Sequence, residues 1–215
     1  MKFNKIKIIA PFAHFGVPLT SKKRNTYISP PPSTVLGILK VLFGETIDNF
    51  KFGYTFKYES QLEDLITKYK IDIKELKKKI PFYNLTTDAC IKEYLWNCEL
   101  IIYTNLNTSC LNNMNHILTL GQADCIAKLK LPIEEIELIN KEGKIYNQYT
   151  DISIGTGQIK PITIFTQFNT ETQSYDSKIS HLRFNTEVPY NKFYNEETQE
   201  NIYVWSKKGD GINVC

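Results

Sequence analysis

Two periods of apolar residues run along this chain, and each predicts one kind of element. Polar and apolar residues alternate over residues 5–9 and 50–58, which predicts a strand at each place. Apolar, β-branched and aromatic residues concentrate over residues 94–104, 126–131 and 135–139, which predicts three more strands. The first half of the chain is therefore expected to form a sheet.

A helical period follows the first predicted strand, which should stop at Pro11. Prolines precede Ser33 and Thr34, and rigid φ angles and hydroxyl side chains favour a helix start there, with Ser33 as the expected cap. Apolar residues then cover most of the helix surface up to Gly44, the expected C-terminal cap. Gly37 costs about 1 kcal/mol relative to alanine inside a helix, so it indicates close approach of another backbone.

Apolar spacing predicts a second helix over residues 61–80 and a short one over 111–118. Beyond Gly143 the chain is turn-rich and β-like, with strands expected over residues 161–168, 182–188 and 201–206. The order strand, helix, strand, insert, strand, helix, strand is that of a split βαβ unit. We therefore predict an α+β fold: a ferredoxin-like, RRM-like domain over residues 1–140 with a helical insert at about 60–92, and a β-rich C-terminal region over 141–215.

Composition narrows the class of protein. The apolar fraction is 42% and the aromatic fraction 13%, which is typical of a globular chain. No apolar run reaches the roughly 18–20 residues that span a bilayer, and residues 1–10 lack the apolar core of a signal peptide. The five cysteines are scattered and form no Cys-x-x-Cys pair. We expect a cytoplasmic protein with reduced, buried cysteines and no membrane partner.

Charge is distributed unevenly along the chain. The net charge is +3, yet no carboxylate precedes Glu45, whereas the rest of the chain carries 26 − 7 = 19 basic against 23 acidic residues. The basic residues before Glu45 are Lys2, Lys5, Lys7, Lys22, Lys23, Arg24 and Lys40. Such a segment suits an edge that faces phosphates.

The loop between the first strand and the helix carries residue types suited to single-stranded RNA. Lys22, Lys23 and Arg24 can neutralise phosphates, and the rings of His14, Phe15 and Tyr27 can stack on bases. Ser33 and Thr34 with the first helix amides suit an anion, and Gly37 and Lys40 follow on the same helix. Alternatives remain open: Phe12 and Phe15 are equally compatible with core positions, and Ser33 with a purely capping role.

The sequence offers little catalytic chemistry. It contains no phosphate-binding loop, no His-Glu-x-x-His, no Gly-x-Gly-x-x-Gly and no Gly-x-Ser-x-Gly, and we expect neither a metal nor another cofactor. Metal-independent RNA cleavage needs an acid and a base, roles that histidine can fill. Of His14, His116 and His181, only His14 lies in the candidate loop. We expect a non-catalytic protein, with a metal-independent endoribonuclease as the alternative.

Two stretches, Pro11-Phe12-Ala13-His14-Phe15-Gly16 and Pro31-Pro32-Ser33-Thr34-Val35-Leu36-Gly37, resemble the N-terminus of the CRISPR-associated RAMP proteins of Cas family five. Weaker similarity comes from Tyr94-Leu95-Trp96-Asn97 and from Leu120-Gly121-Gln122-Ala123-Asp124. Gln122 stands where the family usually has arginine. This departure argues against a charge-mediated contact there, although Gln122 stays among the RNA-binding candidates. The resemblance covers about the first 140 residues.

The resemblance implies a palm with an inserted thumb and a role as a type I Cascade subunit, with the type I-B branch nearest. Such a subunit caps the 5′ handle of crRNA, contacts the backbone RAMP subunit and the large subunit, and meets target DNA through the complex. The type I-C branch cleaves crRNA with a Tyr, Lys and His set, which no motif maps onto this sequence. A mainly structural subunit, whose basic edge meets an acidic protein, is a third hypothesis.

Overall fold

The computed structural model describes residues 1–214 except 19, 21, 45–46, 71–85, 110, 112–116 and 209–210. Among the described residues, antiparallel sheet dominates and α1 (Pro32–Phe43) is the single α-helix. The α+β expectation therefore overestimates the helix content. The expected helix over 111–118 falls mostly on residues outside this description.

The described residues form one large sheet with the strand order β14-β13-β3-β5-β1-β7-β6. Its central strands are β3 (Phe50–Lys57), β5 (Thr86–Thr104), β1 (Lys2–Ala13) and β7 (Ile126–Glu137), and each neighbouring pair is antiparallel. The chain passes from β1 through α1 to β3, and β5 lies between the two strands. The short β6 (Leu118–Thr119) pairs with β7 at the edge.

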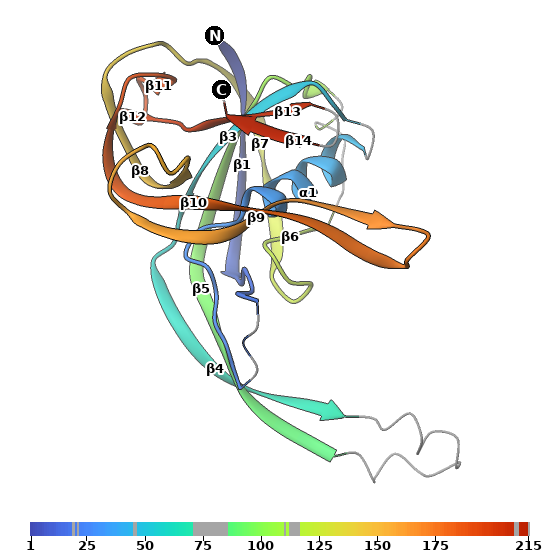
Figure 1. The fold of residues 1–215 in the computed structure, drawn as a ribbon. Coiled ribbons are helices and arrows are strands. Elements are labelled where there is room, and N and C mark those ends of the chain that lie inside the picture. The colour runs from blue at the N-terminus through green and yellow to red at the C-terminus, as the bar shows by residue number, and fades with distance from the viewer. Residues whose placement is uncertain are drawn as a thin grey trace.

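Two further strands extend β5 beyond the body of the sheet. β4 (Ser60–Lys70) pairs antiparallel with residues 86–96, and the two form a curved ribbon that projects from the molecule (Figure 1). The two-residue β2 (Lys23–Arg24) pairs in parallel with Ile91 and Lys92. The basic loop is therefore attached to the middle of the ribbon, where Leu65 and Asp64 pair with the same two residues.

A smaller sheet in the C-terminal region has the order β8-β10-β9. Its strands are β8 (Gly143–Thr150), β10 (Ser174–Tyr190) and β9 (Gln158–Asn169), followed by the short pair β11 (Tyr194–Asn195) and β12 (Glu200–Asn201). The chain then returns to the large sheet, where β13 (Val204–Lys208) pairs with β3 and with β14 (Gly211–Val214). The expected boundary near residue 140 stays a prediction.

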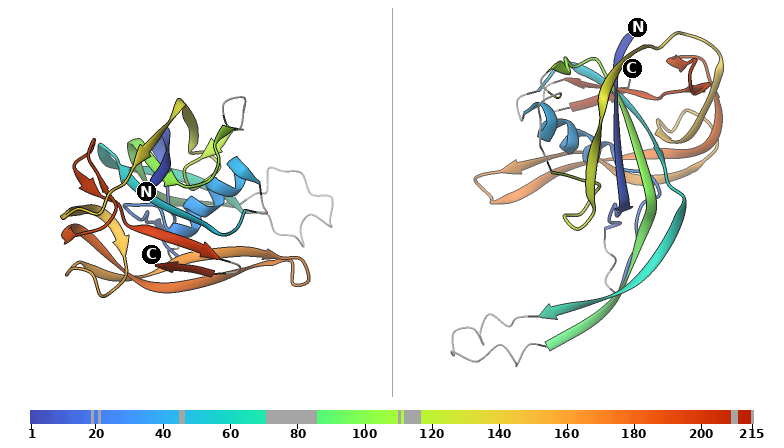
Figure 2. Two further views of the ribbon diagram at one scale, coloured as in Figure 1. Left: turned by 90° about the horizontal axis from the view of Figure 1, so that it is seen from above. Right: turned by 180° about the vertical axis from the view of Figure 1, so that it is seen from behind.

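Helix α1 lies between the large sheet and the β9–β10 hairpin (Figure 2). One apolar core joins all three layers, because Leu39 of α1, Tyr54 of β3 and Ile162 of β9 belong to the same buried cluster. The expected helix burial is confirmed for most positions, and Gly44 caps the C-terminus with φ 99°. Gly37 and Val41 are exposed, and no atom of the described chain lies within 4 Å of a Cβ built on Gly37.

Three predictions of local structure are wrong. The first strand runs through Pro11 to Ala13, and the two strands expected over 126–139 form one strand, β7. The helix expected from residue 61 is strand β4 up to Lys70, so the insert is a β-ribbon over its described part. Leu62, Leu65 and Tyr69 have helical spacing, yet all three are exposed. Pairing with β5 satisfies the backbone there and overrides the helical period.

Among the described residues, no helix is long and apolar enough to cross a membrane.

Candidate nucleic-acid interface

A pocket of about 250 Å³ lies at the start of α1. Six residues predicted from the sequence line it, and they come from three separate segments of the chain: His14, Phe15, Tyr27, Ser33, Thr34 and Gln122. Hydroxyl side chains of the C-terminal sheet, from Thr163, Thr166 and Ser177, complete one wall. The structure thus brings together over half of the predicted RNA-binding residues.

Backbone pairing closes the loop that follows β1. The amide of Tyr27 donates to the carbonyl of Phe15 at 2.8 Å, and the amide of Val17 donates to that of Asn25 at 3.0 Å. The hydroxyl of Thr26 accepts from the amide of Phe15 at 2.8 Å. The loop therefore folds back on itself and presents Gly16 and Pro18 to the pocket.

The aromatic residues of this loop are more buried than stacking requires. Phe15 is 2% exposed, and its ring packs edge-on against Phe56 at a centroid distance of 5.3 Å. Tyr27 is also buried, and its hydroxyl donates to the carbonyl of Pro161 at 3.3 Å. Of the two alternatives left open for Phe15, the structure shows the core position. Stacking of a base on the face of Phe15 or Tyr27 is therefore not supported.

His14 is buried as well, with 1% exposure. Its Nδ1 lies 2.7 Å from the carbonyl oxygen of Glu93 on β5, and its amide donates to the carbonyl of Leu120. Burial lowers the pKa of His14, and the neighbouring charge of Lys92 acts in the same direction. His14 thus contributes a neutral ring edge to the pocket, and no open face on which a base could stack.

The Leu120-Gly121-Gln122 stretch places Gln122 in the pocket. Gly121 has φ 96°, and a Cβ there would overlap the carbonyl oxygen of His14 and lie 3.1 Å from the ring of Phe15. Only glycine combines this conformation with so close an approach. The glycine of this short motif is therefore required by the packing of the loop against residues 120–122.

Ser33 does not cap the helix, so that prediction is wrong. The N-cap position is Pro31, which has no side-chain donor or acceptor, and the amide of Thr34 donates to its carbonyl at 2.9 Å. Ser33 and Thr34 lie in the first helical turn, where no acidic residue is present, and both line the pocket. Because Ser33 is not needed for capping, both hydroxyls can serve a ligand beside the positive helix end.

Four of the seven early basic residues form ion pairs with acids from later parts of the chain. The pairs are Lys2–Glu135, Lys5–Glu134, Lys5–Glu197, Lys7–Glu99, Lys23–Glu63 and Lys23–Glu93. The interpretation of the whole segment as a phosphate-facing edge stays a prediction, although ion pairs engage four of its seven basic residues. Within the described part of the chain, exposed Lys22 and half-buried Arg24 form no ion pair. Lys40 lies 5.8 Å above the ring of Phe165 and belongs to the helix side of the core.

Sequence reasoning missed a polar cluster beneath the pocket. Lys92 has only 3% of its side chain exposed, and its Nζ donates to Asp124 at 2.5 Å and lies 4.3 Å from the ring centroid of Tyr94. The Tyr94 hydroxyl also donates to Asp124, at 2.8 Å. Although burial opposes ionisation, these two hydrogen bonds hold the pKa of Asp124 at about 2. Two stretches singled out in the sequence, which contain Tyr94 and Asp124, were the available signals.

A second missed feature is an exposed aromatic pair on the face of β1 and β5. Phe12 is 36% and Trp96 37% exposed, and their ring centroids are 4.8 Å apart. The two residues are direct partners in the β1–β5 register. Phe12, for which both a core and a stacking position were open, therefore lies at the surface.

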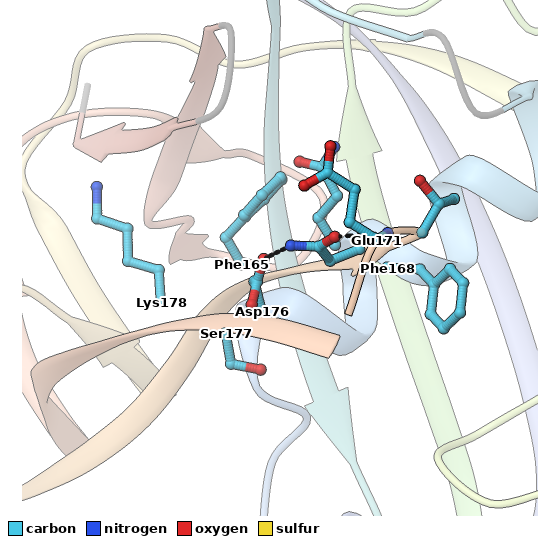
Figure 3. Close-up of a pocket in the computed structure, with 9 residues that line it drawn as sticks. Phe165, Phe168, Glu171, Asp176, Ser177 and Lys178 are labelled. Carbon is cyan, nitrogen blue, oxygen red and sulfur yellow. Dashed lines mark hydrogen bonds between the residues drawn. The ribbon is translucent and has the colours of Figure 1, made fainter. Parts of the chain in front are cut away.

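A larger hollow of about 570 Å³ lies at the end of the β9–β10 hairpin (Figure 3). Glu171, Asp176 and Lys178 line it, and Asn169 donates a hydrogen bond to Asp176 at 2.9 Å. Two carboxylates against one lysine disfavour phosphate, and none of the residues predicted from the sequence lines this hollow. We therefore place the candidate interface at the start of α1. No group of three or more histidine, cysteine or carboxylate side chains that could hold a metal occurs among the described residues.

Comparison with known proteins finds one matching family. Residues 5–94, which include the first loop and the helix start, match the model of the family described as CRISPR-associated protein (Cas_Cas5). This part of the chain is therefore similar to that CRISPR-associated family. The sequence motifs of the loop and the helix start had indicated this same family, so the predicted resemblance is confirmed. No curated protein matches the sequence.

Solved structures share the fold of this chain at low sequence identity. A chain of a "CRISPR RNA-guided surveillance complex" aligns with a TM-score of 0.53 and 14% identity, over 87% of this chain and 91% of that one. A chain of the "Type III-B Cmr-beta bound to cognate target RNA and AMPPnP" aligns with a TM-score of 0.60 and 12% identity, over 86% of both chains. At these identities the likeness establishes the fold.

We expect Gly121→Ala to lower the free energy of unfolding by about 2–5 kcal/mol, because it adds a strained φ and an overlap with His14. Gly37→Ala is the matched control, since its Cβ meets open space within the described chain. It should raise the free energy of unfolding by about 0.5–1 kcal/mol through helix propensity. Urea denaturation of both variants tests the pair. Equal stability of the two variants would contradict the packing described for Gly121.

We expect Asp124→Asn to destabilise the fold at neutral pH by about 1–3 kcal/mol, because it leaves Lys92 without a countercharge. The pKa of Asp124 is lowered from 3.8 to about 2, so its ionised form stabilises the fold above 3.8 and this contribution disappears as the pH falls toward 2. The stability difference from the wild type should therefore shrink over that range. Urea denaturation at several pH values measures it, with Asp176→Asn as a matched charge change. A difference independent of pH would refute the coupling.

Proposed function

We propose that this chain is a non-catalytic RNA-binding subunit of a CRISPR ribonucleoprotein and binds the 5′ handle of crRNA at the start of α1. The observation that carries the proposal is the convergence of six predicted residues from three segments in one pocket. Hydroxyl groups and the Gln122 amide supply neutral hydrogen-bonding groups there. Lys22 and Arg24, on the loop that also contributes Gly16, supply positive charge for the RNA backbone.

The partners follow from the same proposal. The structural neighbours are chains of CRISPR complexes, which supports a place in such an assembly. We propose that this assembly is a type I Cascade, with type I-B as the nearest branch. In that assembly the chain contacts the backbone RAMP subunit and the large subunit, and target DNA reaches it through the complex in the cytoplasm. The strands β3, β5, β1 and β7 with α1 would form the ferredoxin-like palm, and the β4–β5 ribbon would take the place of the thumb.

Replacing Lys22 and Arg24 by alanine should weaken retention of crRNA and flatten its salt dependence. The slope of log affinity against log salt should fall by about 0.7 for each single-strand phosphate that the variant no longer neutralises. Lys130→Ala with Lys192→Ala removes the same charge from exposed positions away from the loop and should leave the slope unchanged. Wild-type retention at every salt concentration would instead favour the structural subunit, in which the loop meets an acidic protein.

The alternative of a metal-independent endoribonuclease gains one specific observation. The structure places a histidine, a tyrosine and a lysine together: the rings of His14 and Tyr94 lie 6.0 Å apart, and Lys92 lies over Tyr94. Lys92 is held as a cation by Asp124, so it could stabilise negative charge but cannot act as a base.

We expect the purified chain to leave repeat RNA intact in the presence of a chelator, which gel electrophoresis of labelled RNA measures. A ribonuclease added in trace amount provides the positive control. Cleavage by the wild type that His14→Ala and Tyr94→Phe both abolish would establish the enzyme in place of our proposal.

A further inference from the structure

One ring nitrogen of His14 has no role in the fold. Nδ1 lies 2.7 Å from the carbonyl oxygen of Glu93, and a carbonyl oxygen only accepts hydrogen bonds. Nδ1 therefore carries the proton. Because burial also lowers the pKa of this histidine, the ring is neutral and Nε2 presents a lone pair. Among the described residues, Nε2 has no hydrogen-bond partner.

Nε2 is accessible through a gap in the loop. A Cβ built on Gly16 would lie 3.5 Å from Nε2, and the φ of Gly16 is one that any residue can adopt. Gly16 itself is exposed, and both residues line the pocket at the start of α1. The absence of a side chain at position 16 therefore leaves this buried acceptor open to a ligand.

The rest of the pocket is uncharged. Its polar groups are the hydroxyls of Tyr27, Ser33, Thr34, Thr163, Thr166 and Ser177 and the amide of Gln122. Its apolar surface comes from Phe15, Pro18 and Pro31. Such a lining suits the uncharged part of a nucleotide better than its phosphate, because a buried phosphate would need cations. Hydroxyl and amide groups adapt to donors and acceptors alike, whereas the neutral ring edge of His14 can only accept.

We propose that this pocket holds one nucleoside of the bound RNA, and that His14 Nε2 accepts a hydrogen bond from an N–H of its base or from its 2′-hydroxyl. The inference rests on the proposed function and adds a residue that determines which nucleoside is accepted. An edge that only accepts disfavours a nucleoside that presents a lone pair at the same place.

Gly16→Ala is the decisive variant, because its methyl group would cover Nε2 at ordinary van der Waals distance without straining the backbone. The probe is fluorescein-labelled single-stranded RNA with the sequence of the guide 5′ end recovered by co-purification with the chain. We expect the affinity of the full chain for this RNA to fall about tenfold. The midpoint of thermal unfolding should match the wild type. The salt slope should also be unchanged, because no charge is removed.

His14→Phe provides the second variant, since it keeps a ring of similar size and removes the acceptor. It should lose a similar factor in affinity, again with the wild-type salt slope. The all-2′-deoxy version of the probe separates the two donors. If the effect of Gly16→Ala persists on the deoxy probe, the donor is a base N–H. If the effect disappears, the donor is the 2′-hydroxyl.

Wild-type affinity in Gly16→Ala would overturn the inference and leave the proposed function standing. Failure of the wild-type chain to bind the RNA at any salt concentration would overturn the proposed function itself. The two failures are therefore distinguishable in one set of titrations.

Discussion

Strand β5 spans nineteen residues, and its backbone must find hydrogen-bond partners along both edges. The first half of β5 pairs with β2 on one edge and with β4 on the other. Its second half pairs with β1 on one edge and with β3 on the other. This requirement orders the rest of the molecule. It places α1 between β1 and β3, holds the basic loop beside the ribbon, and brings the carbonyl of Glu93 to the ring of His14.

The pairing of β1 with β5 also determines where the candidate site forms. The register sets Ala13 opposite Leu95, so the chain leaves β1 beside residues 92–94 and turns back through Gly16. Gly121 then packs on the carbonyl of His14, and the start of α1 supplies the remaining wall. The pocket therefore combines residues 14–34 with residues 121–122, which are distant in the sequence. The charges of the early lysines contribute little to the assembly of this pocket, because most of these lysines form ion pairs within the sheet.

Local sequence patterns predicted an element correctly where its apolar spacing matched the residues that are buried in the fold. Helix α1 was predictable because prolines, an apolar surface and Gly44 all indicate one short buried helix. The ribbon was not, because Leu62, Leu65 and Tyr69 fit a helical period while their pairing partners lie well over a dozen residues further along the chain. For the site, residue types were found but their roles were not. Burial of Phe15, capping by Pro31 and the pairing of Lys92 with Asp124 depend on contacts that no local pattern contains.

The parallel pairing of β2 with β5 has a mechanical consequence. Lys23 and Arg24 pair with Ile91 and Lys92, which belong to the ribbon itself. Glu93, whose carbonyl orients His14, is the next residue along β5. A partner that bent the ribbon would therefore also displace the backbone that positions Lys23, Arg24 and the ring of His14. Displacement of the ribbon and occupancy of the pocket would therefore be energetically coupled.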